Sequence, residues 1–475
     1  MTAFVRTLGA CGMLLLLAAC STPRPPQAVE VQPPAGWVAP LPHGGQMADL
    51  AQWWRQWNDP ALVPLIEAAQ SISPSVAQAR SRLLQARATQ TTASAALKPT
   101  LDGQASASRG FNEQLAAQAS TAQAGLQAAW ELDLFGANAA TRDAASERLA
   151  GARALWHEAR VSVAAEVALQ TSSLRTCLQQ LDVAERDARS RSETSRLSGL
   201  SERAGFTAPA TAALARASAA EATARTSQQR MQCDVEFKTL VALTGQEEAA
   251  LRQLITATPV VPAPDSLFAI ATLPVQVVSQ RPDVYNAERE VAAASAEVGN
   301  AQAQRYPRLS LSGSVGAAWV RTGGVTTDLS TWTLGPLALS VPLFDGGRRT
   351  AQVDAAQARY DESVALYRGR IRQAVSEVEQ ALVRLQSTAE RNTSARTAAD
   401  GYRISFDATE ARWRGGLASL VELEDSRRTA LAAQNALLAL QHERQSAWIA
   451  LYRAAGGGWD ATAPEMAATA QAGTR

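Results

Sequence analysis

Histidine is scarce in this sequence of 475 residues, and only His43, His157 and His442 occur. The three are far apart in the chain and lack the spacing of metal ligands, so we expect no metal site. The sequence also lacks a nucleophile elbow, a phosphate-binding loop, a dinucleotide-binding loop and a zinc-protease motif. We therefore predict a protein that is not an enzyme and that has no cofactor.

The sequence also has no marked excess of positive or negative charge. Lysine and arginine number 45 against 44 aspartate and glutamate, for a formal net charge of +1. A basic surface is the usual mark of a nucleic-acid-binding protein, so we expect no nucleic acid as partner. Aromatic residues make up only 5%, and alanine dominates the apolar residues. Because alanine is the strongest helix former, this composition favours helices over a thick core.

The N-terminus carries an apolar run, Leu8–Ala19, after a single basic residue, Arg6. The run is too short for a membrane-spanning helix and is typical of a secretory signal. Its end, Leu17-Ala18-Ala19-Cys20, resembles a bacterial lipobox. That resemblance implies cleavage before Cys20 and lipid on Cys20, and Ser21 favours sorting to the outer membrane. A plain signal with a chance cysteine is the alternative.

The two halves of the remaining chain have the same order of elements. Pro282 follows Pro74 by 208 residues, and Gly416 follows Gly205 by 211 residues. Each half passes from a strand into a helix at Leu-Phe and a glycine, which indicates an internal two-fold repeat. The predicted segments are a signal peptide (1–19), a lipidated cysteine with a proline-rich tether (20–50), repeat 1 (51–245), a linker (246–274), repeat 2 (275–459) and a disordered tail (460–475). Repeat 1 is predicted to contain a β-hairpin (99–135), a long helix (137–203) and a return helix (207–243), and repeat 2 has the counterparts 307–343, 347–414 and 417–455.

Apolar and polar residues alternate through both predicted hairpins. In the second, Leu309, Leu311 and Val315 alternate with serines and glycine. A period of two predicts strands with one apolar and one polar face, about as long as a tilted transmembrane strand. Unpaired strand edges are not tolerated in lipid, and four strands cannot close a barrel. We therefore predict an oligomer; the alternative is four strands of a soluble sandwich.

The predicted long helices exceed ordinary globular helices in length. No proline interrupts 137–203, and a helix of about 65 residues is roughly 100 Å long. In the second long helix apolar residues recur at alternating steps of three and four, which indicates coiled-coil packing against a neighbour. These residues are Val364, Tyr367, Ile371, Ala374, Val378, Ala381 and Leu385.

The ordered motifs resemble those of the outer membrane factors, the TolC-like ducts of Gram-negative efflux systems, and most closely their NodT-type lipoprotein branch. The resemblance extends from about Trp53 to Trp459. Its motifs are WELDLFG at 130–136, RPDV at 281–284 with Ala287 and Glu288, PLFDGGR at 342–348, and GGGW at 456–459.

This resemblance implies a mixed α and β membrane protein. It implies a homotrimer with a 12-stranded outer-membrane β-barrel, four strands per chain, continued by a long periplasmic α-helical coiled-coil tunnel. The implied function is the exit duct of a tripartite efflux pump, which passively conducts drugs or other small toxic compounds to the exterior. Its implied partners are a periplasmic adaptor (membrane fusion) protein, an inner-membrane RND-type transporter and outer-membrane lipid.

Two other functions fit the same pattern. A duct for type I protein secretion has the same fold, and a neighbouring gene for an ABC exporter would favour it. A structural coiled-coil lipoprotein of the envelope belongs to a different class and would form no pore.

Two cysteines lie outside the signal and the lipobox. Cys177 lies 28 residues before Gly205 and Cys233 lies 28 residues after it. In an antiparallel helical hairpin that reverses at Gly205, the two would lie at the same level. A disulfide is plausible in the oxidising periplasm, and two unpaired buried thiols are the alternative.

The turns of the two helical hairpins are candidate docking tips for the adaptor. Gly205-Phe206 and Gly416-Leu417 each place a glycine where the chain reverses and an apolar residue beside it. In the resembling family this end meets the adaptor. The alternative is that the glycines only make the turn.

Val421, Asp425 and Arg428 follow the second tip at steps of four and three, which places them on one helix face. By resemblance this face narrows the resting periplasmic aperture, although Val421 stands where a larger leucine is usual. Three copies of Asp425 would repel one another unless Arg428 or Arg427 pairs with each, and such an acidic ring would bind divalent cations. The alternative is an ordinary surface ion pair.

Overall fold

The computed structural model of the chain describes residues 22–39, 54, 57, 59–112, 117–258 and 274–459. These residues form two compact units. Unit 1 comprises the described part of Met1–Val31 together with Ser81–Arg153 and Tyr285–Arg370, and unit 2 comprises the described parts of Gln32–Arg80, Ala154–Val284 and Ile371–Arg475.

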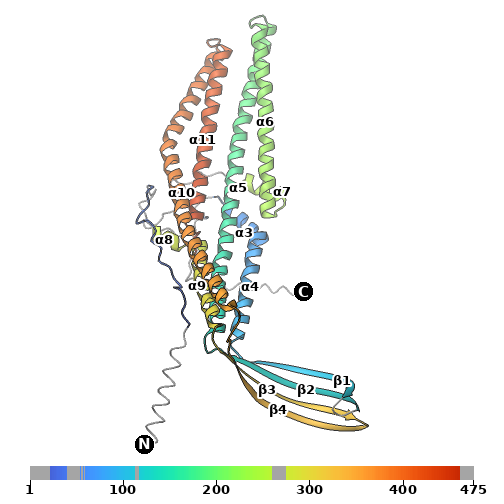
Figure 1. The fold of residues 1–475 in the computed structure, drawn as a ribbon. Coiled ribbons are helices and arrows are strands. Elements are labelled where there is room, and N and C mark those ends of the chain that lie inside the picture. The colour runs from blue at the N-terminus through green and yellow to red at the C-terminus, as the bar shows by residue number, and fades with distance from the viewer. Residues whose placement is uncertain are drawn as a thin grey trace. The chain divides into compact units, whose positions relative to one another are not determined.

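Helices make up most of the described chain, and two of them, α5 and α10, contain 67 residues each. In unit 2, α5 and α6 run antiparallel as one hairpin, and α10 and α11 form another (Figure 1). None of the described helices has an apolar stretch long enough to cross a membrane. The bounds are α3 (Leu62–Ile72), α4 (Pro74–Ala95), α5 (Ala137–Arg203), α6 (Pro209–Thr244), α7 (Glu248–Ala257), α8 (Pro274–Ser279), α9 (Pro282–Ala303), α10 (Arg348–Arg414) and α11 (Leu420–Ala454).

Unit 1 contains a four-stranded antiparallel sheet in the order β1-β2-β3-β4 (Figure 1). The strands are β1 (Thr100–Asn112), β2 (Ala117–Leu132), β3 (Arg308–Thr322) and β4 (Val325–Ser340). Pairing of β2 with β3 joins the hairpins of the two repeats. Gly125 lies opposite Gly316 in this pairing, and a Cβ at Gly125 would come within 2.8 Å of the Val315 carbonyl oxygen. The close approach of the backbones explains why both positions are glycine.

The same device starts both long helices. The Asp133 carboxylate accepts hydrogen bonds from the backbone N–H groups of Asn138 and Ala139, at 3.1 and 2.7 Å. The Asp345 carboxylate accepts from Gly347 and Arg349 at the start of α10, at 3.1 and 3.3 Å. Carboxylates at a helix N-terminus satisfy free N–H groups and favour the helix dipole. The repeated passage from strand to helix is therefore a capping motif.

An N-terminal segment without helix or strand packs on the helices of unit 1. The Arg24 guanidinium pairs with Asp143 at 3.1 Å, and the carbonyl oxygens of Pro25 and Pro26 accept hydrogen bonds from Ser295 and Tyr360. A Cβ at Gly299 of α9 would lie 2.5 Å from the Arg24 side chain, so this contact needs glycine there. Part of the predicted tether is thus a docked segment.

Unit 2 has an apolar core to which Leu65, Val167, Leu382 and Trp448 contribute. Beside it lies the buried Arg281, whose guanidinium donates to Asp283 at 2.8 and 2.9 Å, to Glu377 at 2.7 Å and to the Ala454 carbonyl at 3.1 Å. These bonds hold the start of α9 against α10 and the end of α11, which explains the Arg-Pro-Asp motif.

The structure differs from the sequence prediction between the repeats. The segment 246–274 was expected to be a linker, yet α7 forms at its beginning. Leu251 and Ile255 are four residues apart and therefore lie on one face of α7. Both are buried in the core of unit 2, so α7 is a short amphipathic helix.

Candidate functional site

The two helical hairpins reverse with the same backbone geometry. Gly205 and Gly416 have positive φ angles of 79° and 73°. The N–H groups of Phe206 and Leu417 donate to the carbonyl oxygens of Ser201 and Arg412, five residues earlier. This pattern is the Schellman motif, in which a left-handed glycine ends a helix. The sequence therefore folds into a tight turn at both predicted tips.

Each tip exposes an apolar side chain. Phe206 is 87% exposed and Leu417 is 74% exposed. A Cβ added at Gly205 or Gly416 would meet no atom within 4 Å. A larger residue at either glycine would strain the backbone but would find open space, so it would mainly change the surface of the tip.

The return helix of the second hairpin has a strong start. The Ser419 side chain accepts from the Glu422 N–H, and the Glu422 carboxylate accepts from the Ser419 N–H at 2.7 Å. This reciprocal pair is a capping box. The hydrogen bonds from Ser419 hold the pKa of the Glu422 carboxyl below its usual range. Glu422 thus serves the fold of the tip, next to the residues predicted for the aperture.

The three residues predicted for the aperture lie exposed along α11. Val421 is 67% exposed, and the side chains of Asp425 and Arg428 are 64% and 78% exposed. Asp425 forms an ion pair with Arg428. Of the two arginines considered as its partner, Arg428 therefore fills that role. In one protomer such an exposed pair contributes only a few tenths of a kcal/mol.

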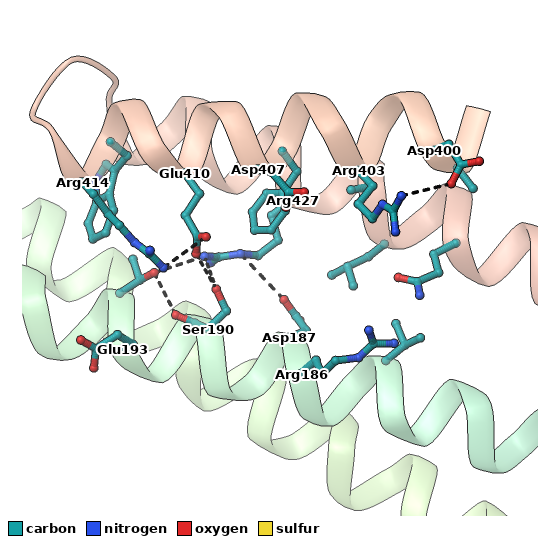
Figure 2. A pocket seen from close by; sticks show the side chains of 18 of the residues that line it. Arg186, Asp187, Ser190, Glu193, Asp400, Arg403, Asp407, Glu410, Arg414 and Arg427 are labelled. Atoms are coloured by element: carbon teal, nitrogen blue, oxygen red, sulfur yellow. Dashed lines mark hydrogen bonds and ion pairs between the residues drawn. The ribbon is translucent and has the colours of Figure 1, made fainter. Parts of the chain in front are cut away.

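Arg427, the neighbour of Arg428, points the other way and is 2% exposed. From α11 its guanidinium reaches α5, where it donates to Ser190 at 3.1 Å and to Thr194 at 3.2 Å (Figure 2). It also donates to Glu424 at 2.6 Å and lies 3.9 Å from Asp187. A buried ionic contact therefore joins the second helical hairpin to the first.

A second arginine completes this buried cluster, which comprises Asp187, Arg191, Glu424 and Arg427. The Nε–H of Arg191 in α5 donates a bifurcated hydrogen bond to the two carboxylate oxygens of Asp187, each 2.9 Å away, and the Arg191 guanidinium also pairs with Glu424. Burial raises the pKa of the Asp187 carboxyl and lowers the pKa of the Arg427 guanidinium, because water no longer stabilises either charge. The two charges of each sign offset one another, and loss of any one would leave a buried charge without compensation.

A cavity of about 480 Å³ adjoins the cluster and is lined by α5, α10 and α11 (Figure 2). Phe406 of α10 lies beside it, with the Arg427 guanidinium carbon 5.4 Å from the centre of its ring. The space between the two hairpins is thus incompletely packed near the tips, next to their ionic contact.

The sequence analysis did not predict that Arg427 is buried. Leu420, Leu423 and Arg427 follow one another at steps of three and four, and all three are buried. The heptad spacing places Arg427 on the packing face of α11, where a charge needs an acidic partner. The sequence offers Glu424, three residues before Arg427, as that acidic partner.

The two cysteines predicted to lie at one level meet across the first hairpin. Cys177 of α5 and Cys233 of α6 have their Sγ atoms 2.07 Å apart and their Cα atoms 5.6 Å apart. This is the geometry of a disulfide. Cys20, the predicted lipid site, lies outside the described residues.

We predict that the purified protein carries this bond. Alkylation without reduction should add no alkyl group at Cys177 or Cys233. Alkylation after reduction should add one alkyl group at each. A Cys233→Ala variant is the control, since Cys177 should then be alkylated without reduction. Equal masses before and after reduction of the wild type would contradict the bond.

Known proteins resemble this chain along nearly all of its length. The sequence profile of the family described as "Outer membrane efflux protein" matches residues 65–246 and 273–457. The pyoverdine export outer membrane protein OpmQ of Pseudomonas putida is 31% identical over 475 positions, covering 95% of this chain and 97% of that protein. The toluene efflux pump outer membrane protein TtgI of Pseudomonas putida is 28% identical, with coverages of 94% and 97%. Among solved structures, the outer-membrane channel OprN is 27% identical with a TM-score of 0.76, covering 91% of this chain and 99% of that one.

Proposed function

The chain belongs to the outer membrane efflux protein family, and on that premise we propose that it is the exit duct of a tripartite pump for small toxic compounds. It is an outer-membrane efflux protein and not an enzyme. The observation that carries the proposal is the sheet of unit 1. Four strands share one apolar face, and the two outer strands, β1 and β4, each pair with only one strand of this chain.

A trimer is the assembly that this sheet supports. Lipid does not tolerate unpaired strand edges, so β1 of one copy should pair with β4 of the next. Three copies supply twelve strands, with the apolar face toward lipid and the polar face toward water. The helical hairpins of the three copies would then surround the periplasmic part of the duct.

Planar-bilayer recording of the purified protein tests this function. A duct should give discrete single-channel conductance, and a structural envelope lipoprotein should give none. Deletion of the gene should sensitise the cell to compounds that the pump exports, and the full chain should restore resistance. Loss of polypeptide secretion without loss of resistance would favour the type I secretion duct instead.

The hairpin tips are the proposed docking surface for the periplasmic adaptor protein, which links the duct to an inner-membrane RND-type transporter. Both tips expose an apolar residue beside a glycine at which an added Cβ would meet no atom within 4 Å. Three copies would present six such tips, and the same turn occurs in both repeats. Apolar contacts between matching hairpins would seat the adaptor.

We predict that Gly205→Leu and Gly416→Leu lower drug resistance while the trimer still assembles, because each adds a side chain to the docking surface. The measurements are the minimal inhibitory concentration of an exported drug and the oligomer on a native gel. Gly199→Leu is the control, since a Cβ at this helical glycine also meets nothing within 4 Å. Full resistance in both tip variants would argue against docking at the tips.

Cys20 is the proposed site of a lipid anchor. Cys20→Ala should abolish incorporation of labelled palmitate, because the acyl chains need the cysteine. The barrel should still insert, since its apolar strand face supplies most of the affinity for the membrane. Palmitate labelling of the variant at the wild-type level would contradict the lipobox assignment.

A further inference from the structure

Near the hairpin turns, a row of polar and charged residues crosses the apolar face of the sheet in unit 1. Strand pairing places Arg109 of β1 opposite Ser120 of β2, Ser120 opposite Arg321 of β3, and Arg321 opposite Thr326 of β4. Directly opposed residues point to the same side of an antiparallel sheet. The four side chains, which we call the arginine row, therefore project together from one face.

The rest of this face is apolar up to the end near the helices. Between Trp319 and the helices, the rows of this face contain leucine, valine, alanine, glycine and tryptophan. The exception is Ser330 on the outer strand β4. The charged residues of the face are Arg109, Arg321 and Asp328, and all three lie toward the hairpin turns. Charge is thus confined to one border of the face that should meet lipid.

The spacing along β3 gives the level of this border. Ten residues separate Leu309 from Trp319, a rise of about 34 Å along the strand. At a tilt of about 40° this becomes about 26 Å along the membrane normal, close to the height of the apolar band of an outer-membrane barrel. The Trp319 row, which includes Asp328, and the arginine row one step closer to the hairpin turns should therefore lie where lipid headgroups begin.

The arginine row has free hydrogen-bonding groups and room for a ligand. Within the described part of the chain, the side chains of Arg109 and Arg321 have no ion-pair or hydrogen-bond partner, and both residues are exposed. A shallow hollow of about 450 Å³, open to the surface, is lined by both arginines, by Ser120, Thr326 and Trp319, and by their neighbours. Asp328 is diagonal to Arg321 and leaves an excess of positive charge.

We propose that the arginine row binds the phosphorylated headgroup of an outer-leaflet glycolipid, the lipid A part of lipopolysaccharide. This inference rests on the proposed function, because the helices must be periplasmic for the hairpin turns to reach the outer leaflet. Guanidinium groups donate paired hydrogen bonds to phosphate, and two strand spacings separate the arginines by about 10 Å. The hydroxyl groups of Ser120 and Thr326 add donors, and exposed Trp319 lies at the level of an interfacial aromatic girdle.

The test is a titration of the purified trimer in detergent with bis-phosphorylated lipid A, read by native mass spectrometry. Arg109→Gln with Arg321→Gln should weaken binding by at least about tenfold. Arg308→Gln should bind like the wild type, because this exposed arginine lies at the other end of β3. Removing the lipid A phosphates should weaken wild-type binding to the same extent, an arm that requires no variant.

Three outcomes would overturn the proposal: equal binding by the double variant and the wild type, binding that survives removal of the phosphates, and displacement of lipid A by inorganic phosphate alone. The last would indicate a simple anion site. Conductance in a bilayer without lipid A keeps this test separate from the proposed function. A wild type that conducts but shows one of these outcomes loses only the lipid site, and a wild type that never conducts loses the duct.

Discussion

Replacing Arg427 by alanine should destabilise each protomer by about 3 to 5 kcal/mol, the usual cost of breaking a buried ion pair from one side. The change leaves Asp187 and Glu424 with one arginine between them in a largely buried site. The measurement is guanidinium unfolding of the trimer in detergent, followed by the helical circular dichroism signal.

Arg428→Ala is the matched control, because it removes the same side chain from the next residue of the same helix. Arg428 is exposed, and its loss should change stability by no more than about 0.5 kcal/mol. The double variant Arg427→Met with Glu424→Leu removes one charge of each sign, so it should recover most of the stability. If Arg427→Ala and Arg428→Ala unfold together with the wild type, the buried cluster does not join the hairpins as described.

The second large effect should appear in conductance. Asp425→Ala should raise the single-channel conductance and remove any block by divalent cations added on the periplasmic side. In the proposed trimer three copies of Asp425 would surround the axis, and their carboxylates would attract divalent cations into the narrowest part of the duct. Within each protomer, Arg428 partly neutralises the carboxylate of Asp425.

Glu221→Ala is the control for this measurement. Glu221 of α6 is also an exposed carboxylate paired with an arginine of its own helix, Arg225, but lies on the other hairpin. It should leave both conductance and block unchanged. If Asp425→Ala also leaves both unchanged, the constriction lies elsewhere, and the pair of Asp425 and Arg428 is an ordinary surface contact.

Local patterns in the sequence predicted the elements of this fold well. The alternation around Leu309 and Leu311 marks a strand, and the proline-free stretch 137–203 is one helix with those bounds. Gly205 and Gly416 mark the turns because only a residue without Cβ adopts their φ angles at no cost.

Contacts between distant segments were less predictable. The sequence shows that Arg427 follows Leu423 on a packing face, but not that Arg191, more than two hundred residues earlier, shares its carboxylates. The docking of Arg24 against Asp143 likewise depends on a surface that several helices build together. The short α7 was missed because the prolines after it dominate the composition of the segment.

The docking of the N-terminal segment also sets an order in time. Pro25 and Pro26 bond to Ser295 and Tyr360, 270 and 334 residues later in the chain. During export the first residues to emerge therefore have no surface to bind until most of the polypeptide has followed. Through that interval the N-terminus would be free for the proposed cleavage and acylation at Cys20, and docking would come last, as a closing step of biogenesis.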